Sequence, residues 1–196
     1  MFKHTERILV QALPGGLQTN MAKNLDAGGV DYSGQLILRF RRSYLVQDAG
    51  GHNFWREEII PRTVPADQTA IVICDMWDDH WSRGAAERVD AMALRMNEVV
   101  EQARAKGVQI IHAPSDTLVY YEGTPARYRV KTAPIMLPPK PAERPEPPLP
   151  IDDSDEGSDT GETESHKAWT RQHPAIVIDH DADGISDEGQ EIYSFL

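Results

Sequence analysis

The chain has 196 residues, of which 40% are hydrophobic, and its formal net charge at pH 7 is −11. This length is enough for one domain with a hydrophobic core, or for one domain with an appendage. A strongly negative chain is repelled by nucleic acid and by anionic membrane surfaces, so we expect no nucleic acid and no membrane as partners. Residues 152–164 contain seven acidic residues and no basic one, so the remaining residues account for only −4 of the −11. The total charge therefore identifies no partner.

The single cysteine, Cys74, excludes an internal disulfide and is typical of a reducing compartment. The apolar stretch near the N-terminus, residues 8–13, is interrupted by Gln11 and ends at Pro14, which is unlike a signal peptide. No run approaches the roughly 18 to 20 apolar residues that a membrane-spanning helix needs. We therefore expect a cytoplasmic protein.

The first third of the chain predicts an arm and a hairpin. Residues 1–34 contain several glycines, few large apolar residues and no period, which indicates a poorly ordered arm. Two β-prone segments follow, with Gly50 and Gly51 between them. This pattern predicts a β-hairpin at the edge of a larger sheet.

The next segment predicts a strand, a helix and a second strand. Residues 69–76, TAIVICDM, form a continuous apolar run, as in a parallel-sheet strand that is covered on both faces. Residues 84–106 carry apolar side chains at three- and four-residue steps, followed by Gly107, which indicates an amphipathic helix and its end. Residues 108–114, VQIIHAP, indicate the second buried strand, so a parallel βαβ unit is expected. The apolar helix positions are Val89, Met92, Met96, Val99 and Ala103.

The composition then changes twice. Eight of the 17 residues in 134–150 are proline, which favours an extended linker, and the acidic run after it predicts a solvated loop. Residues 175–179, AIVID, predict a third strand. Residues 186–196 predict a helix with Ser186 as N-cap and an apolar face of Ile192, Phe195 and Leu196. Because this apolar face reaches Leu196, we expect the domain to continue beyond it.

Candidate site residues follow the two predicted parallel strands, where ligands bind in open α/β sheets. Asp75 ends the first strand and is a candidate general base, although aspartate in this position also caps turns. Trp77, His80 and Trp81 either wall a pocket or cover the end of the sheet. Asp116, just past the second strand, is a candidate pocket residue or a loop cap.

Metal sites are weaker alternatives. His80 with Asp78 or Asp79 supplies too few ligands for a convincing site. Residues 179–184 imitate the start of a calcium loop, but position twelve is Gln190 where a glutamate is needed. His112, inside the second strand, is expected to be a core histidine with satisfied hydrogen bonds.

The sequence AIVICDMWDDHW, followed by RMNEVVEQARAKGVQIIHAPSDT, resembles the isochorismatase-like hydrolases, the superfamily that includes nicotinamidases. The resemblance is specific over residues 69–121 and faint over 169–196. It implies an α/β fold, with a three-layer α/β/α arrangement around a mostly parallel, Rossmann-like sheet. We therefore divide the chain into an arm (1–34), the N-terminal part of the domain with an edge hairpin (35–133), an insert (134–168) and a continuation (169–196).

The resemblance also implies a chemistry, in which a cysteine attacks an amide or related carbon with the help of an aspartate base and a lysine. Asp75 matches the family's aspartate. The family's lysine is expected in residues 183–187, which contain none, and Lys131 and Lys167 stand in other contexts. The nucleophilic cysteine belongs to a later turn than this chain reaches.

Two further positions depart from the family pattern. The metal-binding Asp-x-His of nicotinamidases corresponds to Asp116, Thr117 and Leu118, so no metal and no cofactor are expected. Cys74 is no substitute nucleophile, because neighbouring side chains of a strand point to opposite faces and Cys74 faces away from Asp75. We expect Cys74 to be buried in the core.

The leading hypothesis is an isochorismatase-like hydrolase that acts on a small amide-type molecule, with Asp75 as base for a cysteine that these residues do not contain. The alternative is a non-catalytic relative that binds a ligand or a partner with the same cleft. A calcium-dependent module around residues 179–187 is a third idea. Exposed sheet edges also allow a homo-oligomer.

Overall fold

A computed structural model describes residues 34–140 and 157–196. The predicted arm, except for Gly34, and the middle of the predicted insert fall outside the described residues. The chain divides into two compact units, Met1–Gln68 and Thr69–Leu196, and each is described by itself.

The first unit contains the predicted hairpin. Strands β1 (Gln35–Gln47) and β2 (Asn53–Pro65) pair antiparallel over their whole length, and the 3₁₀ turn Ala66–Gln68 follows. In the connecting loop, Asp48 Oδ1 accepts the backbone N–H groups of Gly50 and His52, and Gly51 adopts φ 84°. This left-handed conformation is one that glycine adopts without strain, which explains the glycine at position 51.

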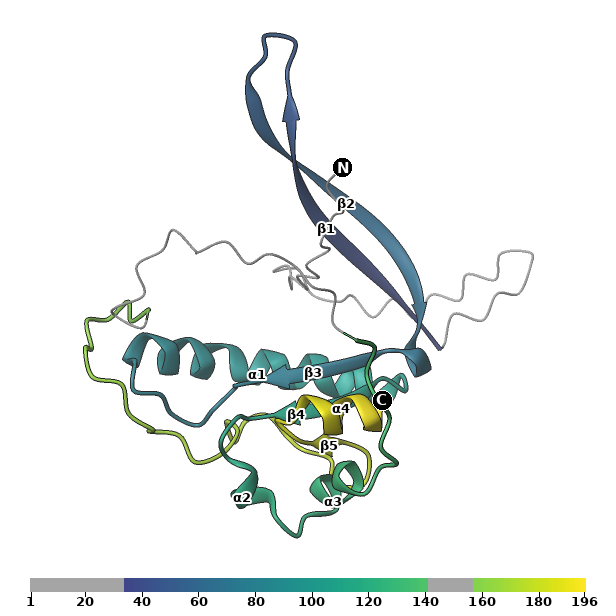
Figure 1. Ribbon diagram of the computed structural model, residues 1–196, viewed down its shortest axis with the longest axis vertical. Helices are drawn as coiled ribbons and strands as arrows, with labels where there is room; N and C mark the ends of the chain where they lie inside the picture. The colour runs from purple at the N-terminus through teal and green to yellow at the C-terminus, as the bar shows by residue number, and fades with distance from the viewer. Residues whose placement is uncertain (1–33, 141–156) are drawn as a thin grey trace. The chain divides into compact units, whose positions relative to one another are not determined.

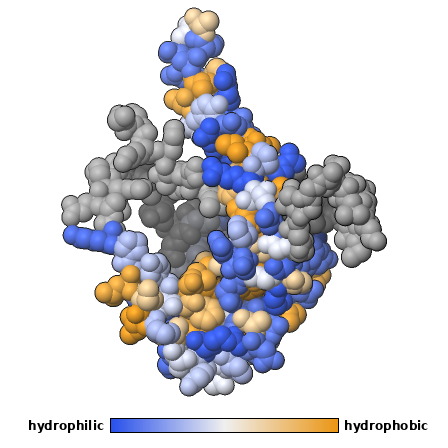
Figure 2. All heavy atoms as spheres, turned by 90° about the vertical axis from the view of Figure 1, so that its right-hand side faces the viewer, coloured by the Kyte–Doolittle hydropathy of each residue, from blue (hydrophilic) through white to orange (hydrophobic). Residues whose placement is uncertain are grey.

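The hairpin is a two-stranded sheet of its own, so the expected edge position in a larger sheet is not found among the described residues. Hydrophobic and hydrophilic residues are intermingled along it, as Figure 2 shows. Ile37 and Trp55 each remain 69% exposed, and arginines lie over aromatic rings on the other face, as Arg62 does over Phe40. An isolated two-stranded ribbon of this kind has no core of its own.

The second unit is built on a three-stranded parallel sheet with the order β3-β4-β5 (Figure 1). The predicted strands are present as β3 (Ala70–Cys74) and β4 (Gln109–Ala113), which pair in register from Ala70 with Gln109 to Cys74 with Ala113. Helix α1 (Arg83–Ala105) connects them. The βαβ prediction and the coarse α/β class are therefore confirmed. Within the described residues, β3 is not covered on both faces, since Val72 is 39% exposed.

The third strand is not where the sequence predicts it. Residues 175–179 are irregular, and β5 (Gly184–Ile185) pairs with β4 instead. Side chains of α1 take both backbone groups of Val177 in the middle of this segment, so these groups are not available to a sheet. Asn97 Oδ1 accepts the N–H of Val177 over 2.8 Å, and Arg104 Nη2 donates to the Val177 carbonyl oxygen over 3.3 Å. A turn from Asp179 to Asp183 then carries the chain to the sheet.

Helix α1 buries a slightly different stripe from the predicted one. Ala93, Val100 and Ala103 are buried, whereas Met92 is 48% exposed. As predicted, Gly107 lies just past the end of the helix, where it adopts φ 91° and donates its N–H to the Arg104 carbonyl oxygen.

Three shorter helices complete the unit. Helices α2 (Leu118–Tyr121) and α3 (Pro125–Lys131) were not predicted, although Thr124 before Pro125 is a recognisable start signal. The predicted last helix is α4 (Gly189–Phe195), and its N-cap is Glu188 rather than Ser186. Leu196, placed on the predicted apolar face, is 61% exposed.

None of the helices in residues 34–140 and 157–196 is long and apolar enough to cross a membrane.

Candidate functional site

Asp75 and the segment that carries Asp116 lie together at the carboxyl ends of β3 and β4. The backbone N–H of Ser115 donates to Oδ1 of Asp75 over 3.1 Å. The N–H of Asp75 donates in turn to the Ala113 carbonyl oxygen over 3.2 Å. One carboxylate oxygen of Asp75 is therefore oriented by the neighbouring loop, as expected for residues that follow adjacent parallel strands.

The two aspartates share an uncommon backbone conformation. Asp75 has φ 53° and Asp116 has φ 61°, and no other non-glycine residue among those described has a positive φ. Aspartate tolerates the left-handed region better than most residues, yet the conformation still costs free energy and is enriched at functional sites. Both loops thus turn sharply at the carboxyl edge of the sheet.

Sequence reasoning missed two charged residues at this edge. Asp187, two residues past β5, accepts the N–H of Asp116 with its Oδ2 over 2.9 Å. Lys167 Nζ donates to the carbonyl oxygen of Asp116. Lys167 was predicted to lie in an unrelated context, and no local pattern marks it, because a tertiary contact alone brings it to the sheet.

The predicted pocket aromatics form a cluster with a tryptophan that the sequence reasoning did not select. Trp169 stacks on Trp77 at 4.3 Å between ring centroids and on His80 at 5.4 Å. Trp81 lies tilted against His80, and Trp77 Nε1 donates to the Ser115 carbonyl oxygen over 3.1 Å. These rings pack on one another, which favours the covering role over the pocket wall. The indole N–H of Trp169 is buried without a hydrogen-bond acceptor.

Asp78 binds the chain that carries Trp169. Its carboxylate accepts the N–H and hydroxyl groups of Thr170, over 2.8 and 2.6 Å, and the N–H of Arg171 over 3.2 Å. Partial burial opposes ionisation of Asp78, but these hydrogen bonds outweigh it and hold its pKa below the usual value. The N–H of Asp78 donates to the Arg171 carbonyl oxygen, and Trp77 forms an antiparallel bridge with Gln172.

Cys74 is exposed, so the prediction of a buried core residue is wrong. The error arises because one face of β3 is open in the described residues. Partial burial of the thiol and the neighbouring charge of Asp75 together raise the pKa of Cys74. A raised pKa lowers the thiolate fraction, so Cys74 does not have the character of an activated nucleophile.

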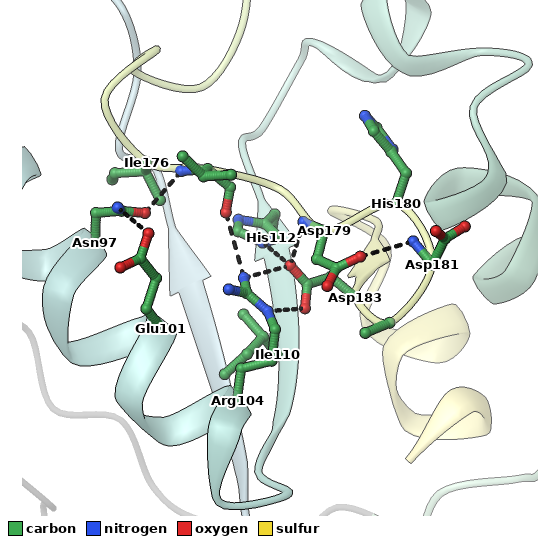
Figure 3. A network of polar contacts seen from close by, with 12 residues as sticks. Asn97, Glu101, Arg104, Ile110, His112, Ile176, Asp179, His180, Asp181 and Asp183 are labelled. Carbon is green, nitrogen blue, oxygen red and sulfur yellow. Dashed lines mark hydrogen bonds and ion pairs between the residues drawn. The ribbon is translucent and has the colours of Figure 1, made fainter.

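Beneath the edge lies a buried charged network (Figure 3). Arg104 donates to Asp183 through Nε and Nη2, over 2.9 and 2.6 Å. His112 contacts Asp183 through Nε2 at 3.0 Å and Gln172 Oε1 through Nδ1 at 2.8 Å. Both ring nitrogens of His112 therefore have a polar partner inside the core. The core-histidine interpretation of His112 is thereby supported.

The same network disfavours the calcium-loop idea. Burial opposes ionisation of Asp183, but hydrogen bonds from His112, Arg104 and the Asp179 N–H lower its pKa to about 2. This carboxylate is therefore already paired with the Arg104 guanidinium and hydrogen-bonded to His112. Within residues 34–140 and 157–196, no group of three or more His, Cys, Asp or Glu residues could hold a metal ion.

A surface hollow of about 750 Å³ lies elsewhere, beside α3. Its lining runs from Glu122 to Thr132 and includes none of the predicted site residues. The carboxyl edge and this hollow are therefore separate features.

A scan against protein-family models, a search of curated proteins and a search of solved structures each found no significant match to this chain.

Proposed function

We propose that this protein is an isochorismatase-like hydrolase that acts on a small amide-type or related molecule. Asp75 is its general base, and the nucleophile is a cysteine that these 196 residues do not contain. The observation that carries the proposal is the position of Asp75 at the carboxyl edge of a parallel strand, in a left-handed conformation, with one oxygen oriented by Ser115. Orienting one oxygen leaves the other free to accept a proton.

In the proposed reaction, the carboxylate of Asp75 takes the proton of the thiol. The thiolate then attacks the amide carbon, the C–N bond breaks, and the amine leaves with the proton returned by Asp75. Water hydrolyses the thioester and regenerates the thiol. A positioned general base of this kind contributes typically 10² to 10⁴ in rate.

Lys167 is the candidate for the family's lysine. Its ammonium group contacts the carbonyl oxygen of Asp116, and Asp75 contacts the N–H of Ser115, the residue immediately before. The two side chains therefore approach neighbouring peptide groups of one loop. In this proposal Lys167, which belongs to the insert, takes the role of the lysine that the family pattern has after the third strand.

The test is the hydrolysis of a panel of small primary amides by the full-length protein, followed as ammonia release. Asp75→Asn is the informative variant because asparagine keeps an acceptor for Ser115 and tolerates the left-handed backbone. We expect kcat/KM to fall by about 10² to 10⁴. Asp79→Asn is the matched control, because Asp79 lies in the same loop and, among the described residues, its carboxylate accepts only the neighbouring His80 N–H. Unchanged hydrolysis in Asp75→Asn would remove the proposal.

A second candidate function is a non-catalytic relative that binds a ligand or partner. It is favoured by the raised pKa of the one cysteine present and by the commitment of Lys167 to a backbone carbonyl oxygen. A cysteine-reactive amide probe distinguishes the two functions. Labelling at a cysteine other than Cys74 in the full-length protein would argue against the binding role.

A further inference from the structure

Residues 157–171, here called the strap, run along the carboxyl edge of the parallel sheet. Figure 1 shows this segment, in light green, on the side to which the β3 arrow points. At one end of the strap, Thr160 Oγ1 accepts the N–H of Gly84 over 3.0 Å, and Asp159 pairs with Arg88. Gly84 has no side chain, and a Cβ there would collide with Asp159. The strap therefore packs directly on the first turns of α1.

The described part of the predicted solvated loop, residues 157–164, is irregular and largely exposed, and Thr160 within it contacts α1. Ser82, the N-cap of α1, makes no side-chain cap, and Thr160 from the strap satisfies a helix N–H instead. Hydrogen bonds from the hydroxyls of Thr160 and Ser158 lower the pKa of Glu162 to about 2. Asp159 and Glu162 thus lie near the positive, N-terminal end of the α1 dipole, which favours their ionised forms.

The middle of the strap meets the candidate site. Lys167 Nζ contacts Asp116, and the Trp169 ring lies against Trp77 and His80. The residues that follow, Thr170 and Arg171, bind Asp78 as described above. Each of these contacts joins the strap to a loop that follows β3 or β4.

The strap differs in burial from the chain that follows it. Lys167 and Thr170 are exposed, and the buried N–H of Trp169 has no acceptor. Gln172 by contrast is 3% exposed, with its side chain between His112 and the Ile176 carbonyl oxygen. Polar surface contacts and an unpaired buried donor stabilise the strap less than the core network stabilises Gln172.

We propose that the strap opens and closes as one unit about Gln172, and that its closed position covers the carboxyl edge and places Lys167 there. Opening then exposes the edge to a small molecule, and closing returns the cation beside the Asp116 loop. The motion follows from the contacts above, whereas its use as a substrate entrance rests on the proposed hydrolase function.

The experiment measures amide hydrogen exchange by NMR in the native protein and in Asp78→Ala. This variant removes the acceptor of Thr170 and Arg171, so faster exchange at those two residues is trivial. The informative amide is Gly84, which Thr160 protects at the other end of the strap. If the strap moves as one unit, Asp78→Ala accelerates exchange at Gly84 by at least about tenfold. Asp79→Ala, which contacts no strap residue in the hydrogen bonds described, is the control and leaves Gly84 unchanged.

The protection of Ile110 and Ile111 in β4 reports whether the variant remains folded. Retained protection in β4 with fast exchange at Gly84 supports the strap. If Asp78→Ala accelerates exchange at Thr170 and Arg171 alone and leaves Gly84 unchanged, the strap proposal is overturned. It is also overturned if, in the native protein, the Gly84 amide exchanges at the same rate as the amides of β4. None of these readouts depends on hydrolysis, so the strap and the proposed function are tested separately.

Discussion

Replacing Asp183 with asparagine removes the charge that balances the buried network. The side chain of Asp183 is 1% exposed, that of His112 is 0% exposed and that of Arg104 is 17% exposed. Removing one partner of a buried ion pair leaves the other charge, here that of Arg104, uncompensated, which typically costs about 3 to 5 kcal/mol. We expect Asp183→Asn to lower the free energy of unfolding by about this amount at pH 7.

The pH dependence gives a second estimate of the same interaction. Folding lowers the pKa of Asp183 from 3.8 to about 2. At about 1.36 kcal/mol for each pH unit, this corresponds to roughly 2.5 kcal/mol. Because the folded-state pKa is the lower one, this stabilisation is fully present above about pH 4 and is lost as the pH falls toward 2. The unfolding free energy should therefore decrease across this window.

Urea denaturation followed by circular dichroism measures both quantities. The native chain should lose stability between pH 4 and pH 2, and Asp183→Asn should lose less over the same range. Asp181→Asn, an exposed aspartate two residues away, is the matched control and should behave like the native chain. A loss below 1 kcal/mol in Asp183→Asn at pH 7, or an unchanged slope between pH 4 and pH 2, would refute this reasoning.

Two further predictions concern packing and the cysteine. In Gly184→Ala, the added Cβ would lie 2.7 Å from Val130 Cγ2, so we expect the free energy of unfolding, measured in urea, to fall by about 1 to 3 kcal/mol. Gly189→Ala is the control: its Cβ meets open space, so the loss should be less than about 1 kcal/mol. The raised pKa of Cys74 predicts slower alkylation by iodoacetamide at pH 8 than for free cysteine, and Asp75→Asn should speed it by removing a negative charge. Equal alkylation rates in the native chain and in Asp75→Asn would show that the charge of Asp75 does not contribute to the raised pKa of Cys74.

Local sequence determined the elements whose patterns are long. The apolar run before Asp75, the helical period that ends at Gly107 and the glycine pair of the hairpin each act through neighbouring residues. A strand period, a helix period and a left-handed turn are short-range properties, so they can be read without knowing the partner segments. The βαβ unit and the hairpin were therefore predicted correctly.

Only the tertiary structure decided which segment became the third strand and which residues reached the sheet edge. Residues 175–179 have the composition of a strand, yet Asn97 and Arg104 of α1 bind the backbone groups of Val177, and Gly184–Ile185 pairs with β4 instead. Lys167 reaches the sheet edge through a contact with Asp116, 51 residues earlier in the sequence, and Trp169 through its stacking on Trp77, 92 residues earlier. No local period encodes such contacts, because they depend on the long-range packing of the strap against two loops.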